Sequence, residues 1–152
     1  MNPCLRAGGL DITDLDALAY YELPVAKLAR QLWARETAGA LPGSGWLDAG
    51  RPEREIRERL GWEGPLLLFP HHLCHAASAY FCSGFERAAV LTVDGVGEWA
   101  TTTYGRGDGS SLEILQEIDF PHSLGLFYAT VTAFLGFEVN DGEYKVMGLA
   151  PY

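Results

Sequence analysis

The sequence predicts a mixed α/β domain in which an antiparallel meander of strands is flanked by helices. A short apolar run at 66–69 precedes a helix-like stretch at 71–81, three strand-like segments follow within 88–118, and helical patterns close the chain. The composition agrees, because 48% hydrophobic and 20% charged residues over 152 positions are typical of a globular domain with its own core.

Residues 1–64 are expected to be a helical lead segment of this domain. Asp11 or Thr13 can cap a helix that runs as far as Leu32, and Pro24 is expected to kink or divide it. Its apolar positions recur near the 3.6-residue helical period: Leu15, Leu18, Ala19, Leu23, Ala26, Leu28 and Leu32.

A loop of Gly, Pro and Ser at 39–45 should separate this helix from a second one at 53–60. Pro52 suits the first helical position, and Gly61 suits the residue just past the end. The alternating acids and arginines of the second helix are interpreted as a solvated face.

The second part of the chain, residues 65–152, has a different character. The strand at 88–93 is apolar on both faces, which is typical of a strand inside a sheet that is covered on both sides. The expected elements are a buried strand at 66–69, a helix at 71–81, strands at 88–93, 98–104 and 112–118, a glycine-rich turn at 105–110, and helices at 124–135 (capped by Ser123 and followed by Gly136) and 143–149.

The charge is concentrated in this second part. Residues 65–152 carry three Lys/Arg against ten Asp/Glu, so they hold −7 of the net −9. Such a surface repels nucleic acid and anionic lipid, and neither is expected as a partner. A phosphate-bearing substrate would need its countercharge from a metal ion or from backbone N–H groups.

The cellular setting is expected to be the cytoplasm. No apolar run reaches the roughly 18 residues of a membrane span, and no secretion signal follows Arg6. The three cysteines lack a framework spacing, so they are expected to be reduced thiols. Cys74 and Cys82 are interpreted as buried small hydrophobes.

The first candidate site lies in His71-His72-Leu73-Cys74-His75. On a helix, His71 and His75 share one face one turn apart, where two imidazoles can reach a single metal. His72 stands where a zinc metalloprotease helix needs its glutamate base, so that class is excluded. A pair of capping or core histidines is the simpler alternative.

The second candidate site is the sequence Asp94-Gly95-Val96-Gly97 at the end of an apolar strand. The carboxylate of Asp94 can hold a cation, and the N–H groups of Gly95 and Gly97 can face a phosphate. An ordinary hairpin turn is the alternative.

Together, Asp94 and the two histidines make a two-histidine, one-carboxylate set that suits Fe(II), Mn(II) or Zn(II) with open positions. An oxygenase could use such a set, but the many short strands that are typical of a jelly-roll oxygenase are missing from the sequence pattern.

Lys145 is either a salt-bridge partner of nearby acids or a contact to an anionic ligand. His122 is interpreted as structural, with contact to an anion as the alternative.

Taken in order, these segments resemble the O-carbamoyltransferase family of antibiotic and nodulation-factor biosynthesis. The resemblance covers residues 70–152 and rests on PHHLCHAASAYFCSGFERAAVLTVDGVGEWATTTYG and FPHSLGLFYATVTAFLGFEVNDGEYKVMGLAPY. It implies a partial actin/Hsp70/sugar-kinase fold, in the branch of the tRNA threonylcarbamoyl-transfer proteins.

The resemblance also implies chemistry. Members use carbamoyl phosphate and ATP to form carbamoyl adenylate, and then transfer the carbamoyl group to a hydroxyl of a small-molecule or sugar acceptor. The family's metal ligands correspond to His71, His75 and Asp94, with iron favoured by the resemblance and zinc by ligand type. The turn at 94–97 and Lys145 would help to hold the nucleotide.

By comparison with the family, further parts of the enzyme are expected beyond Tyr152. These are another metal-ligand aspartate, most of the adenosine pocket, and a second domain like the threonylcarbamoyl-AMP synthases. The chain is therefore expected to act within a larger enzyme. The alternative is a non-catalytic remnant, or a split subunit that acts only with a partner chain.

Overall fold

The computed structural model describes residues 3–38 and 47–152, and the chain divides into two compact units after Pro70. Both units mix helix and strand, so the predicted α/β class is confirmed. The roles predicted for residues 1–64 and 65–152 stay predictions.

The first unit is built on a parallel pair of three-residue strands, in which Leu18 pairs with Leu66 and Tyr20 with Leu68. A parallel pair needs a long crossover connection, and two helices occupy the connection here. The elements of this unit are α1 (Pro3–Gly8), the 3-10 turn η1 (Ile12–Asp14), β1 (Leu18–Tyr20), α2 (Pro24–Ala38), α3 (Arg51–Leu60) and β2 (Leu66–Leu68).

The predicted helix from Asp11 to Leu32 is wrong in its first half. Asp11 caps only the short turn η1, where its side chain accepts from the N–H of Thr13. The segment that follows is extended as β1, because its backbone pairs with β2 instead of with itself. Pro24 begins α2, where its missing N–H costs nothing. The helix α1 was not predicted.

The second predicted helix is confirmed as α3. Pro52 lies in its first turn, and Gly61 ends it in the left-handed conformation, with φ of 63°. Its acids and arginines pair along the exposed surface, as Arg57 does with Glu53 at 2.8 Å. The predicted loop at 39–45 lies outside the described residues.

The strand predicted at 66–69 forms as β2 but is not buried. Leu67 and Leu68 are 48% and 46% exposed. Burial requires a layer of side chains on each face, whereas β2 has only β1 beside it among the described strands.

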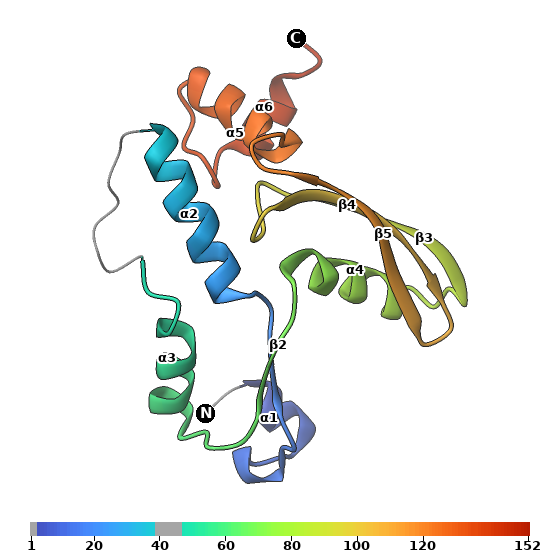
Figure 1. The fold of residues 1–152 in the computed structure, drawn as a ribbon. Helices are drawn as coiled ribbons and strands as arrows, with labels where there is room; N and C mark the ends of the chain where they lie inside the picture. The colour runs from blue at the N-terminus through green and yellow to red at the C-terminus, as the bar shows by residue number, and fades with distance from the viewer. Residues whose placement is uncertain (1–2, 39–46) are drawn as a thin grey trace. The chain divides into compact units, whose positions relative to one another are not determined.

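The second unit is an antiparallel three-stranded sheet in the order β3-β4-β5, with α4 along one face (Figure 1). The elements of this unit are α4 (His71–Phe81), β3 (Arg87–Val93), β4 (Ala100–Asp108), β5 (Ser111–Asp119), α5 (Leu124–Phe134) and α6 (Glu143–Leu149). Each corresponds to a predicted element, and Ser123 caps α5 as expected.

The core of this unit lies between α4 and the sheet. It consists of Ala76, Tyr80 and Val90, with Ala88, Leu112 and Ile114 packed against it. The Tyr80 hydroxyl donates to the carbonyl oxygens of Glu86 and Gly109, which ties the end of α4 to the far end of the sheet.

In the described residues, the first strand of the meander lies at the edge of the sheet and not inside a sheet covered on both sides, as was expected. β3 is an edge strand of the described sheet. Val90 and Thr92 face α4 and are buried, whereas Leu91 and Val93 on the other face are 68% and 50% exposed. Its apolar character on both faces therefore does not correspond to two covering layers in the described chain.

The glycine-rich turn predicted at 105–110 is shorter than expected. Gly105 and Gly107 belong to β4, and only Gly109 and Ser110 make the turn. A Cβ on Gly107 would lie 2.3 Å from the Tyr80 ring. This glycine therefore serves close packing and not chain reversal.

The cysteines are free, as expected, but the burial predicted for two of them is only partly correct. Cys74 is half-buried, and burial raises the pKa of its thiol, with Glu98 adding to the effect. Cys82 is exposed at the end of α4. None of the described helices combines the length and the apolar character needed to cross a bilayer.

Candidate metal centre

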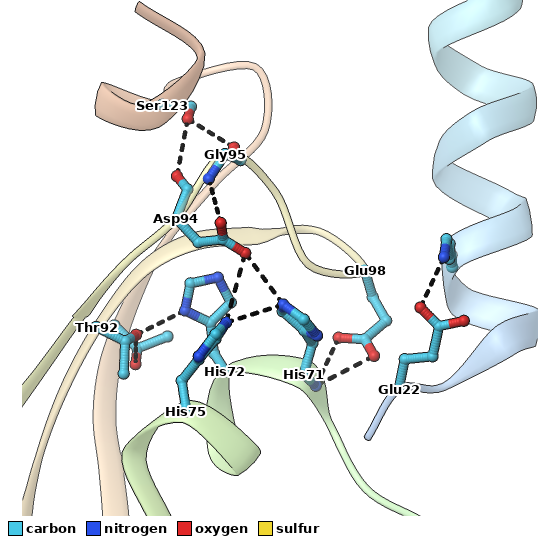
Figure 2. Close-up of polar contacts among 11 residues, drawn as sticks. Glu22, His71, His72, His75, Thr92, Asp94, Gly95, Glu98 and Ser123 are labelled. Atoms are coloured by element: carbon cyan, nitrogen blue, oxygen red, sulfur yellow. Dashed lines mark hydrogen bonds and ion pairs between the residues drawn. The ribbon is translucent and has the colours of Figure 1, made fainter. Parts of the chain in front are cut away.

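Two elements of the second unit bring the candidate ligands together. His71 and His75 project from the same side of the first turns of α4, and Asp94 follows the last residue of β3 (Figure 2). Because α4 packs on β3, the start of the helix lies beside the end of the strand. The three side chains predicted as metal ligands therefore converge.

Their ligand atoms form a small triangle. Nε2 of His71 lies 3.0 Å from Asp94 Oδ2 and 3.0 Å from Nε2 of His75. Nε2 of His75 lies 3.6 Å from the same carboxylate oxygen. A metal at 2.0–2.2 Å from each ligand, with angles of about 90–110° between ligands, places ligand atoms roughly 2.8 to 3.6 Å apart, so the triangle fits a shared ion.

A single proton on Nε2 of His71 cannot make a full hydrogen bond to Asp94 and to His75 at once. If Nε2 of His71 donates its proton to Asp94, it has no lone pair left to accept from His75. If it accepts from His75, it faces the carboxylate without a proton. A shared cation satisfies all three atoms at once, and this is the one such ligand group found among the residues that the structure describes.

The centre is open on one side. The side chains of His71, Asp94 and His75 are 20%, 36% and 50% exposed. Catalytic metal sites keep coordination positions free for water or substrate, and this partial exposure leaves room for such ligands.

The Asp94 carboxylate is oriented by its own turn. Its Oδ1 accepts from the Gly95 N–H at 2.6 Å, which leaves Oδ2 toward the histidines. Burial by itself would raise the pKa of Asp94, but the hydrogen bonds from Gly95 and His71 and the charges of His71 and His75 outweigh it, so the pKa is lowered.

The start of α5 supports the turn from the other side. The Ser123 hydroxyl donates to the carbonyl oxygens of Gly95 and Asp94 at 2.6 and 3.2 Å, and accepts from the Leu126 N–H. A Cβ on Gly125 would lie 2.5 Å from the backbone of Asp94. Only glycine permits this close approach of the helix to the turn.

His72 anchors α4 to the sheet. Its ring is 3% exposed, and its Nδ1 lies 2.6 Å from Thr92 Oγ1, which lies 2.7 Å from Thr103 Oγ1. Burial lowers the pKa of His72, although the Asp94 charge partly opposes this. The buried polar chain joins α4 to β3 and β4 beside the ligand triangle.

Glu98 lies between the Asp94 turn and β4, at the start of α4. Both of its carboxylate oxygens accept from the backbone N–H of His71, at 3.1 and 3.2 Å (Figure 2). The side chain is 8% exposed. A carboxylate is favoured at the positive N-terminal end of a helix.

The two glycines predicted to contact phosphate use their N–H groups within the turn. The Gly95 N–H donates to Asp94, and the Gly97 N–H donates to the carbonyl of Ala100 at 2.9 Å. A Cβ on Gly97 would lie 3.1 Å from the β-carbon of His71. The predicted role of both glycines in nucleotide binding stays a prediction.

Lys145 lies on α6, and no hydrogen bond or ion pair joins it to the ligand triangle in the described part of the chain. Its Nζ lies 5.5 Å from the centre of the Tyr144 ring and 6.0 Å from that of Phe137. The described residues therefore show no salt bridge at Lys145, and its role in nucleotide binding stays a prediction.

The backbone carbonyl of His122 accepts a hydrogen bond from the Thr101 hydroxyl at 2.5 Å, which is a structural contact.

The supporting roles of Glu98, Thr92 and Gly125 are not predicted by the sequence patterns. Each acts on a residue more than 19 positions away, so no local pattern could identify its partner. The cap signal of Ser123 was visible, but its contact with the Asp94 turn was not.

Comparison with known proteins identifies relatives of this chain. Residues 53–152 match the family model described as carbamoyltransferase N-terminus. The uncharacterized protein sll1178 of Synechocystis sp. is 41% identical over the whole chain, which corresponds to 27% of the relative. The matched region thus extends beyond the motifs at 70–152.

Two nodulation proteins are also similar. NolNO of Sinorhizobium fredii is 36% identical over 98% of this chain and 22% of its own length. NolO of Bradyrhizobium diazoefficiens is 46% identical over 54% of this chain and 15% of its own length. The chain thus spans about a quarter or less of these curated relatives.

Proposed function

The chain belongs to the carbamoyltransferase family, and from this membership we propose that it supplies the metal- and nucleotide-binding part of a larger O-carbamoyltransferase. The proposed fold of the complete domain is of the actin/Hsp70/sugar-kinase type. The antiparallel meander with α4 on one face is compatible with that fold.

The observation that carries this proposal is the convergence of His71, His75 and Asp94. Their ligand atoms lie within 4.8 Å of one another, and the family relationship gives a metal there a use. When bound, a divalent ion (iron, or zinc or manganese) would supply a Lewis acid for phosphate or carbamoyl oxygens.

The proposed reaction begins with carbamoyl phosphate, ATP and water, which yield carbamoyl adenylate and release phosphate and pyrophosphate. An acceptor hydroxyl then attacks the carbamoyl carbon, its new C–O bond forms, and the bond to AMP breaks. The acceptor is a sugar or another hydroxyl-bearing small molecule. In this reaction, the chain holds the metal through the three ligands. Its turn at 94–97 and Lys145 contact the nucleotide.

The charge distribution supports a role for a cation. Residues 65–152 hold ten acids against three basic residues, so few side chains can neutralise a bound phosphate. Arg87 and Arg106 are engaged with Asp108 and Glu113. A divalent ion would offset part of the repulsion where the phosphate must bind.

The test is a titration of the full chain with Co(II) or Zn(II), repeated on a His71→Ala/His75→Ala double variant. We expect one equivalent in the wild type and none in the double variant, because the third ligand alone binds weakly. His122→Ala, which removes a ring outside the triangle, should bind as the wild type does. Stoichiometric metal retained in the double variant would contradict the assignment.

The nucleotide part is tested separately, by measuring ATP and AMP affinity with and without the metal. ATP and AMP should bind more tightly to the metal-bound chain, because their phosphate oxygens can enter the open coordination positions of the metal. Equal affinity in both states would contradict a metal–phosphate contact. Metal binding without any nucleotide binding would favour the alternative, a remnant or a subunit that needs a partner chain.

A further inference from the structure

We propose that Glu98 is a positioning residue of the metal centre, and that it acts through the backbone of His71. The inference rests on the proposed function, since it assigns a role at the same site. It adds a residue that contributes no ligand atom to the triangle.

Glu98 contacts the first residue of α4, although the two are far apart in the sequence. Both carboxylate oxygens face the His71 N–H, across a separation of 27 residues. His71 is the first residue of α4, and the first four N–H groups of a helix have no partner within it. The carboxylate therefore caps α4 from a different element.

His71 depends on this cap more than His75 does. A helix frays from its ends, whereas His75 lies one turn further in, where the helical hydrogen bonds hold the backbone. Nε2 of His71 is also the shared corner of the two 3.0 Å contacts of the triangle. A displacement of the first residue of α4 therefore changes both contacts at once.

The location of Glu98 suits this role. At 8% exposure the carboxylate is largely removed from water, and hydrogen bonds to charged acceptors are stronger there. Gly97, the preceding residue, lies so close to α4 that a Cβ on it would be 3.0 Å from the His72 ring. The backbone at 97–98 is thus packed directly against the start of the helix.

The decisive comparison is Glu98→Gln against Glu98→Met. The two substitutes are similar in size and uncharged, but only glutamine keeps an oxygen that can accept from the His71 N–H. Tyr80→Phe is the control, because it removes two hydrogen bonds at the opposite end of α4. It should lower the melting temperature and leave metal affinity unchanged.

Co(II) and Zn(II) affinities are measured on the full chain by competition with a chromophoric chelator. We expect Glu98→Gln to stay within about threefold of the wild type and Glu98→Met to lose about tenfold or more, as when a partner of a metal ligand is removed. In the metal-free chain, amide exchange of His71 should be faster in Glu98→Met and near the wild-type rate in Glu98→Gln.

The outcomes separate the two proposals. Equal affinity in all Glu98 variants, or equal losses in Glu98→Gln and Glu98→Met, would overturn the positioning role while the metal site stands. No binding by the wild type would overturn the metal site, and this inference with it. If Glu98→Met does not fold, Glu98→Asp replaces it: retraction of the carboxylate by one methylene should also weaken binding, and unchanged affinity would overturn the role.

Discussion

His71 is constrained at its backbone, its β-carbon and its ring. Its N–H donates to Glu98, its β-carbon lies beside Gly97, and its Nε2 contacts Asp94 at 3.0 Å. These three contacts come from the short segment that joins β3 to β4. The orientation of His71 is thus set by the same turn that carries Asp94, a second member of the ligand triangle.

The close approach at Gly97 leads to the first prediction. Gly97→Ala places a methyl group 3.0–3.1 Å from the His72 ring and the His71 β-carbon, so the start of α4 must move. We expect metal affinity to fall by about tenfold and the melting temperature to drop.

The matched control is Gly148→Ala on α6, where an added Cβ meets nothing within 4 Å. This change should leave affinity unchanged and slightly stabilise the helix. Metal titration and thermal unfolding of both variants give the comparison. Equal affinities of the two alanine variants would contradict a packing constraint at Gly97.

The second prediction concerns the pH dependence of stability in the metal-free chain. The folded-state pKa of Asp94 is lowered, so its charge stabilises the fold above the unfolded value of about 3.9, and that contribution is lost as pH falls through the folded value. Asp94→Asn removes the charge and should be less stable than the wild type near neutrality.

The difference between the two proteins should shrink in acid and vanish below the folded pKa of Asp94. Urea unfolding at a series of pH values measures it. A difference that stays constant across the series would show that Asp94 acts through packing and not through its charge.

At the scale of elements, three pieces of secondary structure meet at the Asp94 turn. β3 ends there, α4 begins beside it, and the N-terminus of α5 is fastened to it by Ser123. The Ser123 hydroxyl both caps α5 and holds two carbonyl oxygens of the turn. A helix cap and a ligand support are thus combined in one side chain.

The third prediction is that Ser123→Ala destabilises the chain by about 1–2 kcal/mol through loss of the cap. It should also weaken metal binding, because the carbonyl groups of Asp94 and Gly95 lose their donor. Thr130→Ala, which removes an exposed hydroxyl on the same helix, should change neither property. Urea unfolding and metal titration of both variants test this, and equal metal affinities would contradict the support role.

At the scale of the whole molecule, the metal is expected to contribute to the stability of the second unit. The acids of residues 65–152 outnumber its basic residues by seven, and the ligands join two separate elements. An ion that binds only the folded state stabilises it by mass action.

The fourth prediction follows from this linkage. Zn(II) at 100 times its dissociation constant should raise the free energy of unfolding by about 2.7 kcal/mol, and a chelator should reverse the change. The His71→Ala/His75→Ala variant should show no shift. Thermal unfolding with and without metal measures this, and an equal shift in the variant would place the ion elsewhere.

The sequence predicted the second unit better than the first. α4, α5 and α6 have local signals such as periodicity and the Ser123 cap, and the strands of the meander follow each other directly. In the first unit, Leu18–Tyr20 lies within a helical pattern but pairs with Leu66–Leu68, nearly 50 residues later. No local pattern could show this pairing.

The same distinction holds for the candidate site. His71, His75 and Asp94 could be chosen from residue type and spacing, because metal ligands belong to a small set and one helical turn separates the two histidines. Glu98, Thr92 and Gly125 could not, since each contacts its partner only after α4 and α5 have packed on the sheet. The chemistry of the ligands is a local property, whereas their 3.0 Å spacing depends on contacts between distant segments, which exist only in the folded chain.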